Sequence, residues 1–483
     1  MLEAALLIND QDVPATNSAT FERRNPITGD VATRAAAASV EDAIKAADAA
    51  AAAFSTWSAT GPGERRAKLN ATADILTKRA DEFADAVIAE TGGTMIWGRF
   101  NCMLAAGMLR EAAAMTTQIS GEVIPSDKPG AIALAIRQPA GVCLGIAPWN
   151  APVILGVRAV AMPVACGNTV ILKASELCPK THRLIGEVFC EAGLPAGTVN
   201  VVTNAPEDAS AVVDALIAHP AVRRINFTGS TRVGRLIAQE CAKHLKPCLL
   251  ELGGKAPFIV LDDADLDEAV KAAAFGAFMH QGQICMSTER IIALDAVADR
   301  FVEKFADKAA SMKSGDPREG KTPLGSLIGR DAAERNEALV QDAVDKGARL
   351  VAGGGVTGTI MEATVLDNVT PAMRIYNEES FGPTVSIVRV GSIDEAVSVA
   401  NDTEYGLAAS VFGRDVNRAV AVAKRIESGI CHINAPTVHD EAQMPFGGVK
   451  ASGYGRFGGK AAIDEFTDLR WITIQTEPQH YPI

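Results

Sequence analysis

The segment FMHQGQICMSTER, residues 278–290, places Cys285 in a short polar stretch after a helix-like run. A thiol in such a loop can act as a nucleophile, because the sulfur is accessible and its thiolate is the reactive form. A buried structural cysteine is the alternative, since free cysteines are among the most buried residues. The residues elsewhere in the chain decide between these two interpretations.

Two further segments carry side chains that would complete a nucleophilic site. Glu251 ends the apolar run of LELGGK and precedes two glycines. That position suits a general base with backbone close by, and equally a partly buried structural carboxylate. Asn150 lies in the proline-rich turn APWNAP. Its amide can donate to a developing oxyanion or stabilise the turn itself.

A nucleotide site is the chemistry suggested by four other residues. Lys173 and Glu176, in LKASE, follow an apolar run, and doubly wound sheets bind ligands at the carboxyl ends of their strands. This pair can hold ribose hydroxyls, and the carboxylate would repel a 2′-phosphate, which favours NAD over NADP. Gly229 and Ser230, in NFTGSTRVG, precede a predicted helix whose N-terminus can bind phosphate. A solvated charged pair and a plain turn are the alternatives, because the G-x-G-x-x-G fingerprint is absent.

The elements that position these residues alternate between strand and helix. Each of several apolar runs precedes a helix-like pattern, which predicts βαβ units on a parallel, doubly wound sheet. The clearest runs cover residues 169–175, 198–204 and 222–230.

Helices are expected on both sides of this region. Residues 40–57 and 64–90 each have the apolar spacing of one helix. Residues 256–282 predict a strand and then a helix capped by Asp265 that ends near Gly282. Cys285 therefore lies in the loop that follows a helix.

Composition excludes several classes of protein. The chain has 483 residues, enough for about two or three domains. Its net charge of −12 argues against nucleic acid or an anionic membrane as a partner. No segment resembles a membrane span or a signal peptide. The nine scattered cysteines indicate reduced thiols in a cytoplasmic protein, and the seven histidines lack ligand spacing, so no metal is predicted.

Seven motifs then point to one family. Each match is weak alone, but together they occur in the family's order with compatible spacing between about residue 10 and residue 475. They resemble the aldehyde dehydrogenase superfamily, and the segments WNAPVILGVRA and SGYGRFGG are most similar to its bacterial members that act on aromatic aldehydes. The seven are APWNAP, GNTVILKASE, NFTGSTRVG, LELGGK, GQIC, EESFGP and MPFGGVKASGYGR.

The resemblance implies an α/β fold with three parts. A Rossmann-like NAD-binding domain would comprise residues 1–119 and 141–251, and an α/β catalytic domain residues 252–450. A small β arm, residues 120–140 and 451–483, would join two subunits into a homodimer. Both of its segments have β-like patterns, so they can pair with one another.

The resemblance also implies a role for each candidate. Cys285 is the nucleophile, Glu251 the base for deacylation, and Asn150 forms the oxyanion site with the backbone N–H of Cys285. NAD accepts hydride from a thiohemiacetal on Cys285, and water hydrolyses the resulting thioester. The residues implied for the cofactor are Ile146, Pro148, Trp149, Lys173, Ser175, Glu176, Gly229, Ser230, Leu252, Glu379 and Phe381.

The substrate side departs from the family pattern. Arg158 and Ala159 stand where many members have an aromatic residue and a lysine, and Phe457 replaces a glutamate, so the lysine–glutamate pair sometimes assigned to proton relay is absent. Arg158 suits a polar or anionic substrate group such as a phenolic oxygen; alternatively it points away into a salt bridge. The residues expected to line the pocket are Trp97, Ala151, Arg158, Ile284, His439 and Phe446.

The resemblance implies oxidation of salicylaldehyde to salicylate as the expected reaction. Benzaldehyde, vanillin-type and aliphatic aldehydes are the alternative substrates. A CoA-acylating relative is disfavoured because that branch generally lacks the base, here Glu251. A catalytically silent relative is disfavoured by the presence of Cys285, Glu251 and Asn150 together.

Overall fold

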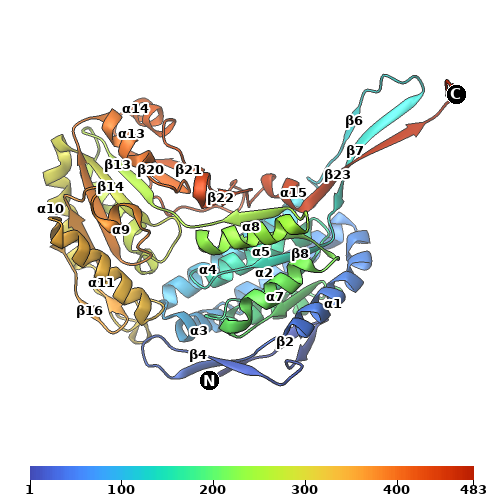
Figure 1. Cartoon of the computed structure of the whole chain (residues 1–483), viewed down its shortest axis with the longest axis horizontal. Coiled ribbons are helices and arrows are strands. Elements are labelled where there is room, and N and C mark those ends of the chain that lie inside the picture. Colours follow the sequence, from blue (N-terminus) through green and yellow to red (C-terminus); the bar gives the residue numbers. More distant parts are fainter.

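Two large sheets, one in each half of the chain, form the framework of the computed structural model, which describes residues 1–483 (Figure 1). The first sheet has eight strands in the order β22-β12-β11-β8-β9-β10-β2-β3. Its strands are β2 (Leu6–Ile8), β3 (Gln11–Val13), β8 (Val142–Ile146), β9 (Thr169–Lys173), β10 (Val199–Val202), β11 (Val222–Thr228), β12 (Cys248–Glu251) and β22 (Gly453–Tyr454).

The five central strands of this sheet are parallel, and their order is that of a dinucleotide-binding fold. Numbered along the chain, β8 to β12 lie in the order 3-2-1-4-5. The strand order reverses between β8 and β11, so their carboxyl ends open a crevice there. The doubly wound sheet expected from the strand–helix alternation is confirmed.

Helices cover both faces of the first sheet, with apolar cores on each side. One face carries α1 (Val40–Ala59), α7 (Ala209–Ala218) and α8 (Thr231–Lys243). The other carries α5 (Pro152–Ala165) and α6 (Pro179–Glu191), backed by α2 (Pro62–Lys78), α3 (Ala80–Thr91) and α4 (Met95–Met115). No helix combines the length and the apolar character that crossing a membrane would require.

The second sheet has seven strands in the order β15-β18-β19-β14-β13-β20-β21, all parallel except β15. Its strands are β13 (Ala256–Val260), β14 (Thr288–Leu294), β15 (Arg349–Ala352), β18 (Thr364–Asp367), β19 (Thr384–Val390), β20 (Ala408–Phe412) and β21 (Ile430–Ile433). The helices of this half are α9 (Leu266–Phe278), α10 (Asp295–Ser311), α11 (Arg330–Asp345), α12 (Arg374–Asn377), α13 (Ile393–Asn401) and α14 (Val416–Ala423).

A third, three-stranded sheet projects from the body as an arm (Figure 1). It contains β6 (Glu122–Ile124), β7 (Ala131–Pro139) and β23 (Thr467–Gln475), and every residue of β23 pairs with β7. The expected pairing of the tail with residues 120–140 is thus present. Residues 451–466 lie differently, because β22 extends the first sheet beside β12 and α15 (Ala461–Phe466) packs against α5.

Several short elements were not predicted. A small sheet near the N-terminus joins β1 (Leu2–Ala4), β4 (Thr20–Arg24) and β5 (Val31–Ala36). The others are the hairpin β16 (Val356–Thr357) and β17 (Ile360–Met361), and the 3₁₀ turns η1 (Pro206–Asp208), η2 (Met279–Gly282), η3 (Pro317–Glu319) and η4 (Lys450–Ser452). Segments this short carry too little periodicity to be recognised.

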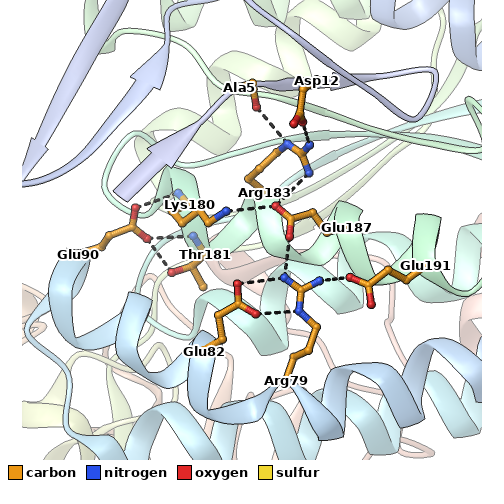
Figure 2. Close-up of polar contacts among 10 residues, drawn as sticks. All are labelled: Ala5, Asp12, Arg79, Glu82, Glu90, Lys180, Thr181, Arg183, Glu187 and Glu191. Carbon is orange, nitrogen blue, oxygen red and sulfur yellow. Dashed lines mark hydrogen bonds and ion pairs between the residues drawn. The ribbon is translucent and has the colours of Figure 1, made fainter. Parts of the chain in front are cut away.

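The single helix expected over residues 64–90 is wrong, because the chain turns at Arg79 and forms α2 and α3 instead. The Arg79 guanidinium forms ion pairs with Glu82, Glu187 and Glu191 (Figure 2). Two of these partners lie on α6, more than a hundred residues away in sequence, so helical periodicity does not reveal the break.

The same network secures the start of α6. Glu90, buried at the end of α3, accepts hydrogen bonds from the backbone N–H groups of Lys180 (2.8 Å) and Thr181 (3.0 Å) (Figure 2). Arg183 donates to the backbone carbonyl of Ala5 at 3.1 Å and pairs with Asp12. These contacts satisfy first-turn donors of α6 and fix the helix that follows the Lys173–Glu176 loop.

Candidate active site

A cavity of about 1040 Å³ opens at the carboxyl ends of β8, β9 and β11, where the strand order reverses. It extends from the Lys173–Glu176 loop to the thiol-bearing loop, so both Asn150 and Cys285 line it. Nine of the eleven residues expected to bind the cofactor also line it. They are Ile146, Pro148, Trp149, Lys173, Ser175, Glu176, Gly229, Ser230 and Phe381.

One end of the cavity carries the expected charged pair. Lys173, the last residue of β9, forms an ion pair with Glu176 three residues later. The Asn204 side chain also donates to Glu176, with 3.1 Å between Nδ2 and Oε1. These contacts orient the carboxylate at the cavity wall, where it can accept hydrogen bonds from hydroxyl groups.

The start of α8 forms another part of the wall. Ser230 caps this helix, and its Oγ accepts the N–H of Val233 at 3.4 Å. Gly229 donates its own N–H to the backbone carbonyl of Glu251 at 3.0 Å. The positive end of the α8 dipole therefore meets the cavity, which suits a phosphate group.

Two of the expected cofactor residues do not line the cavity. Leu252 is buried against α8, where a Cβ on Gly234 would lie 2.4 Å from its side chain. Glu379 accepts the N–H of Gly254 at 2.9 Å, and burial together with the charge of Glu289 raises its pKa to about 7. Both lie just behind residues that do line the cavity.

Sequence reasoning missed the apolar part of the wall. It comes mainly from α8, where three side chains follow the spacing of one helix face and where Leu236 remains 55% exposed. The signal available in the sequence was the spacing of Val233, Leu236 and Ile237 on one face of the predicted helix. The missed apolar residues include Val213, Phe227, Val233, Leu236 and Ile237, and the missed charged ones include Arg232 and Arg335.

The loop that presents Cys285 is rigidly shaped. His280 and Gln281 both adopt left-handed backbone conformations, with φ of 48° and 55°. Gly282 follows at φ 69°, and a Cβ there would lie 2.1 Å from the carbonyl oxygen of Gly382. Non-glycine residues rarely adopt this conformation, so the surrounding contacts must hold it.

Those contacts come from several elements. The Gln281 side chain donates to the Ser326 carbonyl at 2.9 Å, and the Gln283 Oε1 accepts the N–H of Ile328 at 2.9 Å. The Ser287 hydroxyl donates to the carbonyl of Gly282 at 3.0 Å. The turn is therefore fixed on both sides of Cys285, whose sulfur-bearing side chain reaches the cavity.

The Glu251 carboxylate lies beside the Cys285 thiol. A Cβ on Gly254 would be 2.3 Å from the carbonyl oxygen of Cys285, so only a glycine allows the chain leaving β12 to pass this loop. Glu251 is buried, and neither carboxylate oxygen has a hydrogen-bond partner in the chain. Burial raises its pKa to about 7, against the opposing effects of the Cys285 thiol and the charge of Arg158.

The Cys285 thiol is correspondingly held in its neutral form. Burial and the neighbouring Glu251 carboxylate raise its pKa well above the ordinary thiol value. An unpartnered carboxylate beside a neutral thiol can accept the thiol's proton or that of a water molecule. The pair therefore has the composition of a nucleophile and its base.

The Asn150 side chain is held against the loop that carries Cys285. Its Nδ2 donates to the backbone carbonyl of Gln283 at 2.9 Å, which turns the amide nitrogen toward the Cys285 loop. Its own backbone carbonyl accepts the indole N–H of Trp97 at 3.0 Å. An amide nitrogen carries two hydrogens, so a second donor remains available for an oxygen near the sulfur.

Four of the six expected substrate residues belong to the apolar core cluster against which Cys285 packs. Trp97 also stacks on His280, with 4.6 Å between ring centroids, which gives this cluster a flat aromatic wall. The four are Trp97, Ala151, Ile284 and Phe446.

The remaining two lie differently. Arg158 forms an ion pair with Asp440, and its guanidinium lies 4.2 Å from the centroid of Phe446; this is the salt-bridge alternative considered for it. The pair borders a separate small cavity of about 20 Å³. His439 is exposed, with its Nε2 3.0 Å from Glu441, and lines neither cavity. The structure thus separates both residues from the main cavity.

A buried network behind the site was also missed. The Lys255 ammonium lies 2.8 Å from Glu289, and Glu289 accepts the N–H groups of Ser380 (3.0 Å) and Phe381 (3.1 Å). This network holds Phe381 in a left-handed conformation with its ring 5.8 Å from that of Trp149. Glu289 lies in the quoted Cys285 segment, but only the fold brings it to the EESFGP loop.

Comparison with known proteins gives consistent results. The family model described as "Aldehyde dehydrogenase family" matches residues 13–472. A vanillin dehydrogenase from Pseudomonas sp. strain HR199 is 62% identical over 483 residues, which is the whole of both chains. A salicylaldehyde dehydrogenase from Pseudomonas sp. strain C18 is 50% identical over 482 residues, again with complete coverage.

A solved structure has the same fold over its full length. It is the crystal structure of a salicylaldehyde dehydrogenase from Pseudomonas putida G7 complexed with salicylaldehyde. The TM-score is 0.98 at 49% sequence identity, and all of both chains are covered. The arrangement of the two sheets and the arm is therefore shared with that protein.

Proposed function

Because the chain belongs to the aldehyde dehydrogenase family, we propose that it oxidises an aromatic aldehyde to the carboxylic acid with NAD as the hydride acceptor. One observation carries this proposal. Cys285 lines a large cavity with nucleotide-binding features and also packs against the apolar cluster that contains Trp97 and Phe446. An aldehyde and a cofactor can therefore approach the same sulfur from two sides.

The residues of the chain would act in sequence on the aldehyde. Glu251 accepts the Cys285 proton, and the thiolate attacks the carbonyl carbon to form a thiohemiacetal. Asn150 Nδ2 and the backbone N–H of Cys285 donate to the oxyanion, and one such donor is typically worth about 10²–10³ in rate. After oxidation to the thioester, Glu251 loses the Cys285 proton to solvent and, ionised again, deprotonates the water that releases the acid.

The residues around the main cavity fit a dinucleotide. Glu176 can accept from ribose hydroxyls, the start of α8 at Ser230 suits a pyrophosphate, and the apolar face of α8 suits a flat base. When bound there, NAD supplies the hydride acceptor that aldehyde oxidation requires. Glu379, just behind the wall, is proposed to hold the nicotinamide ribose, and Phe381 to pack beside it.

A ring-hydroxylated benzaldehyde is the proposed substrate class. The 62% identity to a vanillin dehydrogenase and the 50% identity to a salicylaldehyde dehydrogenase both support it. The greater identity favours vanillin ahead of salicylaldehyde, which replaces the ranking expected from the motifs alone. The aromatic wall at Trp97 supports a planar ring in either case.

The test is to follow NADH formation with NAD and no CoA, using vanillin, salicylaldehyde, benzaldehyde and hexanal. The two hydroxylated rings should show a kcat/KM at least about 10-fold above that of hexanal, because only a planar ring fills an aromatic slot. A preference for hexanal would overturn the substrate class. A strict requirement for CoA would overturn hydrolysis by Glu251-activated water.

The cofactor choice is tested by the variant Glu176→Gln. Removing this charge should raise kcat/KM for NADP about 10-fold, because the 2′-phosphate no longer meets a carboxylate and Lys173 becomes free to pair with it. Initial rates at varied NAD and NADP measure the effect. Glu207→Gln, which removes a charge from the same cavity that forms no ion pair with Lys173, is the control and should leave the NADP to NAD ratio near that of the parent.

A homodimer is the proposed assembly, in the cytoplasm that the scattered cysteines favour. The arm exposes Val123, Leu469 and Trp471, which are 75%, 64% and 78% accessible. Its outer strand β23 also has a free edge. Apolar side chains on an unpaired edge strand support pairing with another chain.

A further inference from the structure

A buried ion pair lies just behind the wall of the main cavity. The side chains of Lys255 and Glu289 are 0% and 4% exposed, and 2.8 Å separates the Lys255 Nζ from the Glu289 Oε2. Replacing such a pair by well-packed apolar residues is often neutral for stability, so stability alone does not account for these charges. Both side chains bind the EESFGP loop, residues 378–383.

The Glu289 carboxylate holds the middle of this loop. Its Oε1 accepts the N–H groups of Ser380 and Phe381 at 3.0 and 3.1 Å, and it accepts the Ser380 hydroxyl at 2.9 Å. Lys255 holds the start of the loop, because its Nζ donates to the carbonyl oxygen of Glu378 at 2.8 Å. The ion pair therefore fixes the backbone at three residues of the loop.

No other acceptor in the chain replaces Glu289. The N–H groups of Ser380 and Phe381 make no hydrogen bond to any other residue. Arg335 and Asn336, on α11, donate to the Ser380 carbonyl at 2.7 and 3.1 Å, so they hold only the carbonyl side of that peptide. Loss of the Glu289 carboxylate would leave both N–H groups without a partner, which is costly where they are shielded from water.

The loop meets the reacting part of the site on its other side. Phe381 lines the main cavity together with Cys285, and its ring lies 5.8 Å from that of Trp149. Its φ of 46° is rare for a bulky residue, so contacts from other elements must hold this conformation. The carbonyl oxygen of Gly382 touches the turn before the thiol, because a Cβ on Gly282 would lie 2.1 Å from it.

The Glu379 carboxylate belongs to the same loop and is tied to the thiol loop through two glycines. It accepts the N–H of Gly254 at 2.9 Å. Gly254 directly precedes Lys255, and a Cβ on Gly254 would lie 2.3 Å from the carbonyl oxygen of Cys285. A shift of the EESFGP loop would therefore move Glu379 relative to Cys285.

We propose that the Lys255–Glu289 pair fixes the EESFGP loop and thereby positions the nicotinamide half of NAD against Cys285. The two residues are positioning residues, because they act through Glu379 and Phe381 and line no part of the main cavity themselves. This assignment rests on the proposed function, in which Glu379 holds the nicotinamide ribose and Phe381 packs beside it.

The adenosine half of the cofactor provides an internal reference. Its proposed contacts, Glu176 and the start of α8 at Ser230, belong to the first sheet and its helices. Lys255 and Glu289 belong to the second sheet, the first directly before β13 and the other within β14. The pair should therefore affect the binding of NADH but not that of ADP, which lacks the nicotinamide ribose. A general loss of structure would weaken both.

Two double variants isolate the role of the carboxylate oxygen. Lys255→Met with Glu289→Gln removes both charges but keeps an oxygen that can accept the N–H groups of Ser380 and Phe381. Lys255→Met with Glu289→Met removes the charges and the acceptor. Neither variant leaves one buried charge without its partner, which is the main hazard of the single substitutions.

Calorimetric titration with NADH and with ADP, in the absence of aldehyde, measures the effect. With Glu289→Met in the pair, the dissociation constant for NADH should rise about 10-fold, because the loop loses the acceptor of two N–H groups. The constant for ADP should stay within about twofold of the parent value, since its site is distant. With Glu289→Gln in the pair, NADH binding should recover to within about threefold of the parent.

A milder variant and a control complete the test. Ser380→Ala removes only the hydroxyl that donates to Glu289, and it should weaken NADH binding about threefold without changing ADP binding. The control is Asp367→Asn, which breaks a buried ion pair with Arg349 and Arg389 in the same sheet, away from the main cavity. It should lower the thermal stability and leave NADH binding within about twofold of the parent.

Equal weakening of NADH and ADP binding, or equal NADH affinities in the two double variants, would overturn the proposal. The titration needs no aldehyde, so it also separates this proposal from the proposed function. Absence of aldehyde oxidation in the parent protein would overturn the proposed function, while a selective loss of NADH binding would still support the role of the ion pair. Conversely, an active parent whose variants bind NADH unchanged would overturn only the role of Lys255 and Glu289.

Discussion

Replacing Cys285 by serine is expected to lower kcat/KM for every aldehyde by at least about 10⁴-fold. A serine hydroxyl is a far weaker nucleophile than a thiolate. The turn at residues 280–287 is fixed by hydrogen bonds, and no other cysteine lines the cavity. Steady-state NADH formation measures the loss. Iodoacetamide should inactivate the parent protein in proportion to labelling of Cys285.

The matched control is Cys190→Ser. Cys190 is also partly buried, but it lies at the end of α6 and outside the main cavity. This variant should keep kcat/KM within about twofold of the parent, because surface-near substitutions seldom disturb a distant site. Full turnover by Cys285→Ser would contradict the covalent mechanism.

Replacing Glu251 by glutamine should instead separate the two halves of the reaction. Without a base for water the thioester persists, so one equivalent of NADH should form rapidly and steady-state turnover should fall by about 10²–10⁴-fold. Stopped-flow absorbance measures the burst, and intact-protein mass should show an acyl group on Cys285. The rate of the burst should also be lower than in the parent protein, because the Glu251 carboxylate, which neighbours the Cys285 thiol, is no longer present to accept the thiol proton.

The pH dependence of kcat in the parent protein follows from the Glu251 carboxyl group. Burial raises the pKa of Glu251 to about 7, and only its ionised form is a base, so kcat should fall as the pH drops below 7. At pH 6 only about a tenth of the base is ionised, which predicts a comparable fall in deacylation. Once the thiol is acylated it no longer titrates, so this limb reports the carboxyl alone.

Glu90→Gln is the control for Glu251. Glu90 is equally buried, and burial likewise raises its pKa, but it bonds to the start of α6 (Figure 2). The Glu90→Gln variant should be less stable than the parent protein, but its kcat should still fall as the pH drops below 7. If Glu251→Gln turned over without a burst and kept the limb, another group would be the base.

Local patterns were sufficient for the framework of the fold. Strand–helix alternation predicted the doubly wound sheet, because the apolar run of a strand and the periodicity of an amphipathic helix can each be seen within about a dozen consecutive residues. The split of residues 64–90 was not predictable in this way, since Arg79 meets partners on α6. The very short strands near the N-terminus gave no periodicity to detect.

For the candidate site, too, local sequence predicted some features and packing between distant elements decided others. Motifs singled out Cys285, Glu251, Asn150 and the Lys173–Glu176 pair as candidates. Of these, Lys173 and Glu251 end strands of one sheet, and the carboxyl ends of parallel strands meet at one edge. The motifs did not distinguish residues that line the cavity from Leu252 and Glu379 just behind it. Whether a side chain faces a cavity depends on packing between distant elements.

The sequence by itself determined the family, the doubly wound parallel sheet of the first half and the residues with reactive side chains, because these depend on residue types and short spacings. The tertiary structure alone decided which charges balance one another. Arg158 pairs with Asp440, and Lys255 with Glu289, across 282 and 34 positions of the chain. The strength of an ionic interaction inside a protein depends on the distance between the charges and on their burial, and neither can be predicted from local sequence.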